Sequence, residues 1–113
     1  MEYGIDDKYM KELRDILASV PEIEEAVLYG SRARGDYKRG SDIDLTLKGE
    51  KLGREQLVLL RDKLYLSRLP YFVDTNIFSQ LKSQPFINNI LRDGIVISST
   101  DAAMERQNLH YSD

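Results

Sequence analysis

The segment Asp42–Lys48 constrains the fold most, because polar and apolar side chains alternate along it without a break. A period of two is typical of a β-strand with one buried face. The apolar members are Ile43, Leu45 and Leu47. They would enter a core and leave Asp42, Asp44 and Thr46 on the opposite face. The chain must therefore build a sheet that carries an acidic pair on the face away from this core.

The remaining sequence predicts helices and strands around this one. Helical spacing of apolar residues predicts helices over 6–19, 53–68 and 79–92, and apolar or β-branched runs predict strands over 24–30, 71–78 and 95–98. Residues 31–41 are polar and predict a loop with one helical turn. Pro85 is compatible with the third helix only near its first turn, and Gly94 suits its end. The order predicts an α+β fold, a mixed sheet covered by helices mainly on one face.

Length and composition exclude several kinds of protein. The 113 residues suit one domain over 1–113, with 99–113 as a flexible tail or a partner-docking segment. Sixteen Lys and Arg against 19 Asp and Glu give a net charge of −3, so a general nucleic-acid coat is not expected. No cysteine and a single histidine, His110, exclude disulfides, thiolate catalysis and multi-histidine metal sites. We see no membrane span or signal peptide and expect a cytoplasmic protein.

The carboxylates on the alternating strand suit a metal ion. Asp42 and Asp44 would stand about 6.7 Å apart at Cα, given a rise of roughly 3.3 Å per residue. Their repulsion is relieved by protonation or by a divalent cation, and Mg²⁺ prefers carboxylate oxygens. In the strand predicted over 71–78, Asp74 shares a face with Phe72 and Asn76. If the two strands are neighbours, Asp74 joins the acidic group. The alternative is that these acids simply face solvent.

The segment Gly30–Gly35 suits a phosphate group. A glycine after a strand lets the backbone approach an anion, and a serine hydroxyl with free N–H groups can surround it. Arg34 can bind two phosphate oxygens at once, and Arg32 is a further candidate. Lys38 and Arg39 are interpreted as solvated loop residues. A phosphate site one loop away from paired carboxylates is the layout that phosphoryl or nucleotidyl transfer requires.

Gly30-Ser31, ten residues, then Asp42-Ile43-Asp44 resembles the Gly-Ser-x10-Asp-x-Asp signature of the DNA polymerase β nucleotidyltransferase superfamily. The flanking string over residues 30–45 resembles its minimal nucleotidyltransferase (MNT) branch. The resemblance implies the minimal polymerase-β-type fold. It also implies that two Mg²⁺ ions and an NTP bind here. The implied phosphate ligands are Gly30, Ser31 and Arg34, and the implied metal-binding catalytic acids are Asp42, Asp44 and Asp74. Asp74 is followed by Thr75-Asn76, a more polar continuation than the family strand.

The resemblance implies an Mg²⁺-dependent enzyme that transfers a nucleoside monophosphate, AMP from ATP, to a hydroxyl. It further implies a small all-helical HEPN-type partner in a hetero-oligomer, with a tyrosine of this toxin as acceptor and this chain as antitoxin. One alternative is an antitoxin that binds nucleotide and acts by contact alone. Another is a nucleotidyltransferase for a small molecule or an RNA end, although long nucleic acid is not expected. The residues leave the base preference, the acceptor and the oligomeric state open.

Overall fold

The structure is a computed structural model, and it describes residues 1–101 and 103–105. Its elements are α1 (Asp7–Ala18), β1 (Glu25–Tyr29), α2 (Ser31–Arg34), β2 (Ile43–Lys48), α3 (Arg54–Tyr65), β3 (Val73–Ile77), the 3₁₀ helix η1 (Phe78–Gln80), α4 (Gln84–Asp93) and β4 (Ile95–Ser99). This order confirms the predicted α+β succession. His110 and most of the predicted tail lie outside the described residues.

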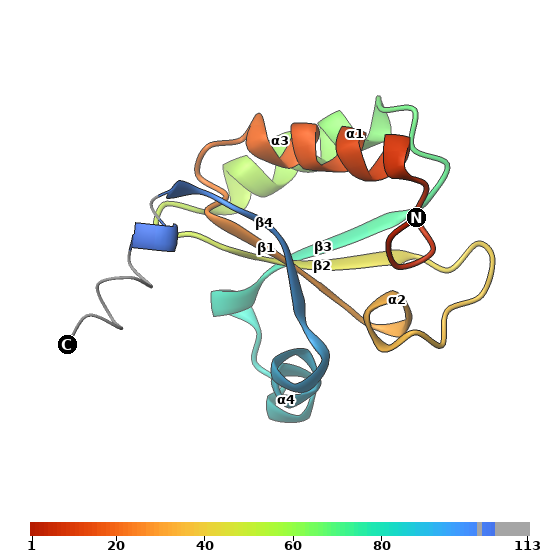
Figure 1. The fold of residues 1–113 in the computed structure, drawn as a ribbon. Helices are drawn as coiled ribbons and strands as arrows, with labels where there is room; N and C mark the ends of the chain where they lie inside the picture. The colour runs from red at the N-terminus through yellow and green to blue at the C-terminus, as the bar shows by residue number, and fades with distance from the viewer. Residues whose placement is uncertain (102, 106–113) are drawn as a thin grey trace.

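The four strands form one mixed sheet in the order β3-β2-β1-β4 (Figure 1). β1 pairs antiparallel with both β2 and β4, whereas β2 and β3 run parallel. β2 and β3 are direct neighbours, as the placement of Asp74 beside the acidic pair requires. β3 and β4 are the two edge strands.

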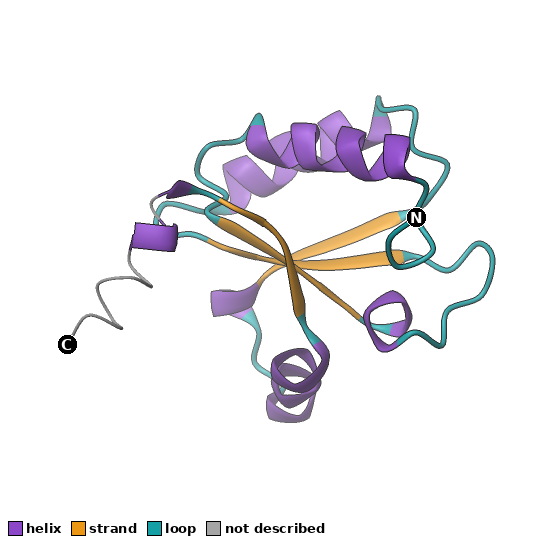
Figure 2. Ribbon diagram, viewed as in Figure 1, coloured by secondary structure: helices purple, strands orange, loops and turns teal. Residues whose placement is uncertain are grey.

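Helices lie on both sides of the sheet, with the two long ones together (Figure 2). α1 and α3 cover one face and bury Ile43, Leu45 and Leu47 completely, which confirms the face predicted from the alternation. α4 lies on the opposite face and packs on a smaller cluster of Val27, Tyr29 and Ile90. This second face is only partly covered, so it can hold a functional site. None of the helices within the described residues has the length and apolar character needed to cross a membrane.

α4 begins later than predicted. Residues 79–92 were expected to be helical, but η1 ends at Gln80 and α4 starts at Gln84. The Ser83 hydroxyl accepts a hydrogen bond from the Phe86 N–H and caps the helix. Proline lacks an N–H and fits only the first turn of a helix, so Pro85 sets this later start.

Candidate active site

One row of side chains crosses three strands on the face opposite α1 and α3. The register pairs Tyr29 of β1 with Asp44 of β2, and Asp44 with Asp74 of β3. Paired residues of neighbouring strands point to the same face, so these three side chains stand side by side. The predicted neighbourhood of the two strands is confirmed, and it places Asp74 beside Asp44. Its metal and catalytic roles remain predictions.

The Asp44 carboxylate is affected by its burial and by the charges around it. Burial raises the pKa of Asp44 above its usual range, and the charges of Asp74 and Asp42 raise it further, while Arg34 lowers it. Asp42 directly precedes β2, and both Asp42 and Asp74 are exposed. The site therefore concentrates negative charge that a bound cation would relieve.

The raised pKa of Asp44, caused first by burial and then by the neighbouring carboxylates, predicts a pH-dependent stability. Because the pKa of Asp44 is raised in the folded state, its contribution to stability is fully present below the unfolded-state pKa and is lost as the pH rises through the folded-state pKa. We expect Asp44→Asn to gain stability relative to wild type as the pH rises from about 4 to about 7. Urea unfolding of both proteins in metal-free buffer at several pH values measures this. A stability difference that stays constant over the range would contradict the account.

The turn between β1 and α2 brings the backbone against the Asp44 carboxylate. Gly30 has φ 75° and ψ −157°, a region open essentially to glycine alone. A Cβ atom placed at this position would collide with Oδ2 of Asp44. The predicted phosphate segment and the predicted metal-binding carboxylate are thus in direct contact. Glycine is required here for both conformation and space.

A cavity of about 290 Å³ opens between this turn, the acidic row and α4. Its lining residues are Tyr29, Gly30, Arg34, Asp44, Asp74, Phe86, Asn89 and Asp93. Four of the predicted site residues therefore line one cavity: Gly30, Arg34, Asp44 and Asp74. Ser31 directly follows Gly30 in the sequence, and Asp42 lies two residues before Asp44. Arg34 Nε lies 3.3 Å from Oδ2 of Asp36, an exposed ion pair that leaves its other nitrogens available.

Residues from α4 and β1 complete the cavity and were missed by the sequence reasoning. Phe86, Asn89 and Asp93 stand on one face of α4. Their spacing of three and four residues is the available signal, although nothing in the sequence places this helix beside Asp44. Tyr29 was interpreted only as a core or rim residue. Its ring meets Phe86 edge-on at a centroid distance of 5.5 Å.

A hydrogen-bonded chain supports the acidic row. Thr46 Oγ1 donates to Oδ1 of Asn76 over 2.6 Å, and Nδ2 of Asn76 donates to the Tyr29 hydroxyl over 2.8 Å. Burial raises the pKa of Tyr29 to about 12, so its hydroxyl stays protonated at neutral pH. The polar continuation after Asp74 therefore has a structural reason: Asn76 joins all three strands.

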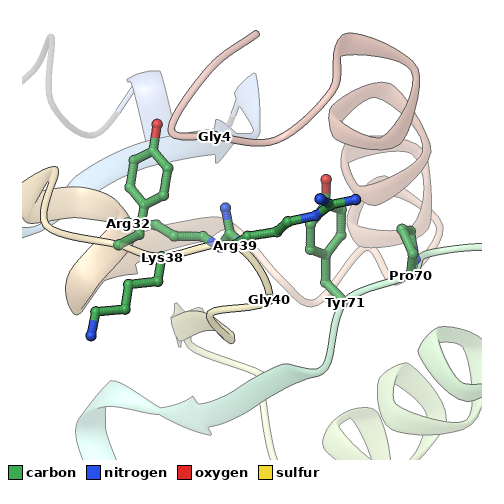
Figure 3. Close-up of a pocket in the computed structure, with 8 residues that line it drawn as sticks. Gly4, Arg32, Lys38, Arg39, Gly40, Pro70 and Tyr71 are labelled. Carbon is green, nitrogen blue, oxygen red and sulfur yellow. The ribbon is translucent and has the colours of Figure 1, made fainter.

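Arg32 differs from its predicted phosphate role. Its side chain is buried, and it donates from Nε and Nη2 to the Ser41 carbonyl (3.0 and 2.7 Å) and from Nη1 to the Tyr3 carbonyl (3.1 Å). The guanidinium also stacks on Tyr37 and Tyr71, 5.3 and 4.9 Å from the ring centroids. It lines a separate cavity of about 380 Å³ (Figure 3). Arg32 thus ties three segments together and holds the residue immediately before Asp42.

Replacing Arg32 should therefore cost stability. We expect Arg32→Ala to lower the free energy of unfolding by about 2–4 kcal/mol, since it empties the space of a buried side chain, leaves two part-buried carbonyls without their donors and removes both ring contacts. Arg39→Ala is the matched control, because Arg39 is exposed in the same loop and should change stability by less than about 0.5 kcal/mol. Urea denaturation measures both. Equal, small effects would show that Arg32 does not hold the loop.

The donor set fits Mg²⁺. Carboxylate oxygens are the ligands that this ion prefers, and Asp44 and Asp74 stand as register partners on neighbouring strands beside the turn at Gly30. Within residues 1–101 and 103–105, no three acidic, cysteine or histidine side chains stand close enough to enclose an ion by themselves. Mg²⁺ usually binds through one or two carboxylates together with substrate phosphates and waters, so the site needs no complete cage.

Comparison with known proteins identifies the family of this chain. The family described as "Polymerase beta, Nucleotidyltransferase" matches residues 11–103. The chain therefore belongs to the polymerase β nucleotidyltransferase family, and by this family it is a nucleotidyltransferase. Curated protein sequences give no match.

Several solved structures share the fold. A toxin–antitoxin protein crystallised with AMP-PNP superimposes with a TM-score of 0.65 at 21% identity, over 91% of this chain and 87% of that one. An MNT antitoxin in complex with the tri-AMPylated HEPN toxin of Shewanella oneidensis gives 0.62 at 19% identity, over 89% and 78%. The toxin–antitoxin MntA-HepT gives 0.61 at 18% identity, over 95% and 88%. These likenesses establish the fold of the present chain.

Proposed function

We propose that this chain is an MNT-type antitoxin that transfers AMP from ATP to a hydroxyl of a partner protein, in an Mg²⁺-dependent reaction. The observation that carries the proposal is the register of Asp44 with Asp74, directly beside the turn at Gly30. Carboxylates next to a backbone turn that can receive phosphate form the arrangement that nucleotidyl transfer needs. The family supports the reaction class.

Each site residue has a distinct role in this proposal. Gly30 and Ser31 bind the β- and γ-phosphates, and Arg34 reaches the same phosphates from the end of α2. Asp42, Asp44 and Asp74 would hold Mg²⁺, which when bound neutralises charge on the triphosphate. Asp74 is exposed and accepts the proton of the attacking hydroxyl. The hydroxyl oxygen bonds to the α-phosphorus, the bond from that phosphorus to the α–β bridging oxygen breaks, and pyrophosphate leaves.

The proposed acceptor is a tyrosine of a HEPN-type toxin encoded beside this chain. Support comes from the fold neighbours, one of which is an MNT antitoxin in complex with a tri-AMPylated HEPN toxin. The cavity at the acidic row has a volume of about 290 Å³ and is open to solvent, so a side chain from another protein can reach it. Transfer to the toxin is then how the antitoxin would neutralise it.

Labelled ATP tests the proposal. The purified chain is incubated with Mg²⁺, the neighbouring helical protein and ATP that carries label in either the α- or the γ-phosphate. We expect α-label in the partner and γ-label only in released pyrophosphate. Failure of α-label to enter the partner, or transfer of γ-label to it, would show that the proposed reaction is wrong. Omission of Mg²⁺ should abolish the signal.

A further inference from the structure

Large apolar side chains are exposed where the chain passes from α3 to β3. Tyr65 is 89% exposed, Leu66 81% and Phe72 67%. A single exposed apolar residue is ordinary, but several together mark a surface that another molecule covers. Tyr65 and Phe72 line the same groove, so they belong to one surface.

This groove has a volume of about 490 Å³ and follows the outer edge of the sheet. Its lining residues are Arg61, Leu64, Tyr65, Leu69, Tyr71, Phe72, Val73, Asp74 and Thr75. β3 is an edge strand, so the groove faces outward. Asp74 lines both this groove and the cavity of the candidate active site. A molecule bound in the groove therefore reaches the acid that would receive the acceptor's proton.

The hydrogen bonds of Arg61 restrict how a partner can bind in this groove. Its Nη2 donates to the Thr75 carbonyl over 2.8 Å, and its Nε donates to the Thr75 hydroxyl over 3.2 Å. An added β-strand would need backbone groups such as this carbonyl, which Arg61 already occupies. Binding through side chains, as in helix-in-groove recognition, needs no free strand edge.

The charge of the groove also selects its partner. Arg61 has no carboxylate partner within the described residues, and it is exposed at the groove wall. An acidic residue beside the apolar contact of a partner would complement this charge.

We propose that this groove docks the acceptor protein, which packs an apolar helical face flanked by an acidic residue on Tyr65 and Phe72 and so presents its hydroxyl at Asp74. The proposal rests on the proposed function, since it assumes that a protein is the acceptor. It assigns the acceptor site to the outer edge of β3, whereas the nucleotide binds on the α4 side of Asp74. The groove would add binding energy without altering the chemical step.

Phe72→Glu tests this docking surface, and Leu91→Glu is the matched control because Leu91 is also exposed, at 64%, but lies on α4. With the neighbouring helical protein as acceptor, we expect Phe72→Glu to raise KM for the acceptor about 30-fold, the size of an interface hot spot. Its kcat at saturation and its affinity for Mg-ATP should stay within about threefold of wild type, because a docking contact contributes uniform binding. Leu91→Glu should leave all three values unchanged. Phe72→Ala should raise KM for the acceptor by a smaller factor, and it keeps the test valid if the charged Phe72→Glu variant misfolds.

The outcomes separate the two proposals. If the wild type transfers no AMP, the proposed function fails and the docking proposal fails with it. If the wild type transfers AMP and both Phe72 variants keep its KM for the acceptor, docking in the groove is wrong and the proposed function stands. Docking in the groove is also wrong if Phe72→Glu weakens Mg-ATP binding and leaves KM for the acceptor unchanged. It is wrong as well if sedimentation shows that the variant converts a dimer of this chain to monomers while KM for the acceptor stays unchanged.

Discussion

Asp44→Asn should lower AMP transfer by about 1,000-fold or more while it stabilises the metal-free protein. The loss in rate is of the order seen when a preorganised group that stabilises transition-state charge is removed. The gain in stability arises because burial and the charges of Asp74 and Asp42 disfavour the ionised Asp44 carboxylate. Opposite effects on activity and stability are the signature of a residue that is kept for function.

Single-turnover transfer and thermal unfolding in metal-free buffer measure the two effects. Asp62→Asn is the control, because Asp62 is an exposed aspartate on α3 that lines none of the cavities described above. It should leave both the rate and the melting temperature unchanged. An Asp44→Asn protein that melts at a lower temperature than wild type would mean that Asp44 is a stabilising residue, contrary to this interpretation.

Gly30→Ala should lower AMP transfer by at least about 100-fold. The added Cβ meets Oδ2 of Asp44, and the residue must also adopt φ 75°, which costs on the order of 1–3 kcal/mol for a residue other than glycine. The turn or the carboxylate must then move, and both belong to the proposed Mg-triphosphate site. We therefore expect the affinity for Mg-ATP to fall together with the rate.

Gly40→Ala is the control that separates the effect of backbone strain from the effect of the contact with Asp44. Gly40 also has a positive φ, 87°, but a Cβ atom there meets nothing within 4 Å. It should lose some stability and keep its affinity for Mg-ATP. If titration calorimetry gives the two alanine variants the same Mg-ATP affinity, the contact between Gly30 and Asp44 does not shape the nucleotide site.

The sequence predicted the parts of the site that depend on local pattern. The alternation along Asp42–Lys48 was enough to place Asp44 away from the core, because the side-chain period of a strand is fixed. The same reasoning placed Asp74 and Asn76 on one face of their strand. The spacing from Gly30-Ser31 to Asp42 then placed the turn at the edge from which β2 begins. The register of Tyr29, Asp44 and Asp74 confirms this arrangement.

Features that depend on contacts far apart in the sequence could not be predicted. Arg32 lies in the middle of the motif and has the chemistry of a phosphate ligand, yet its partners are the carbonyls of Ser41 and Tyr3 and the ring of Tyr71. No local pattern specifies those contacts. The contribution of α4 was missed for the same reason, since Asn89 lines the same cavity as Asp44 and Asp74 because α4 packs on the sheet, with Phe86 against Tyr29.

The central claim is that carboxylates and the turn at Gly30 together hold a metal-bound triphosphate. Titration calorimetry of ATP into the wild-type chain, with and without Mg²⁺, and into Asp44→Asn with Mg²⁺ tests it most directly. We expect ATP to bind the wild type only with Mg²⁺, and binding to Asp44→Asn to be at least about tenfold weaker. Equal ATP affinity in all three titrations would contradict the account.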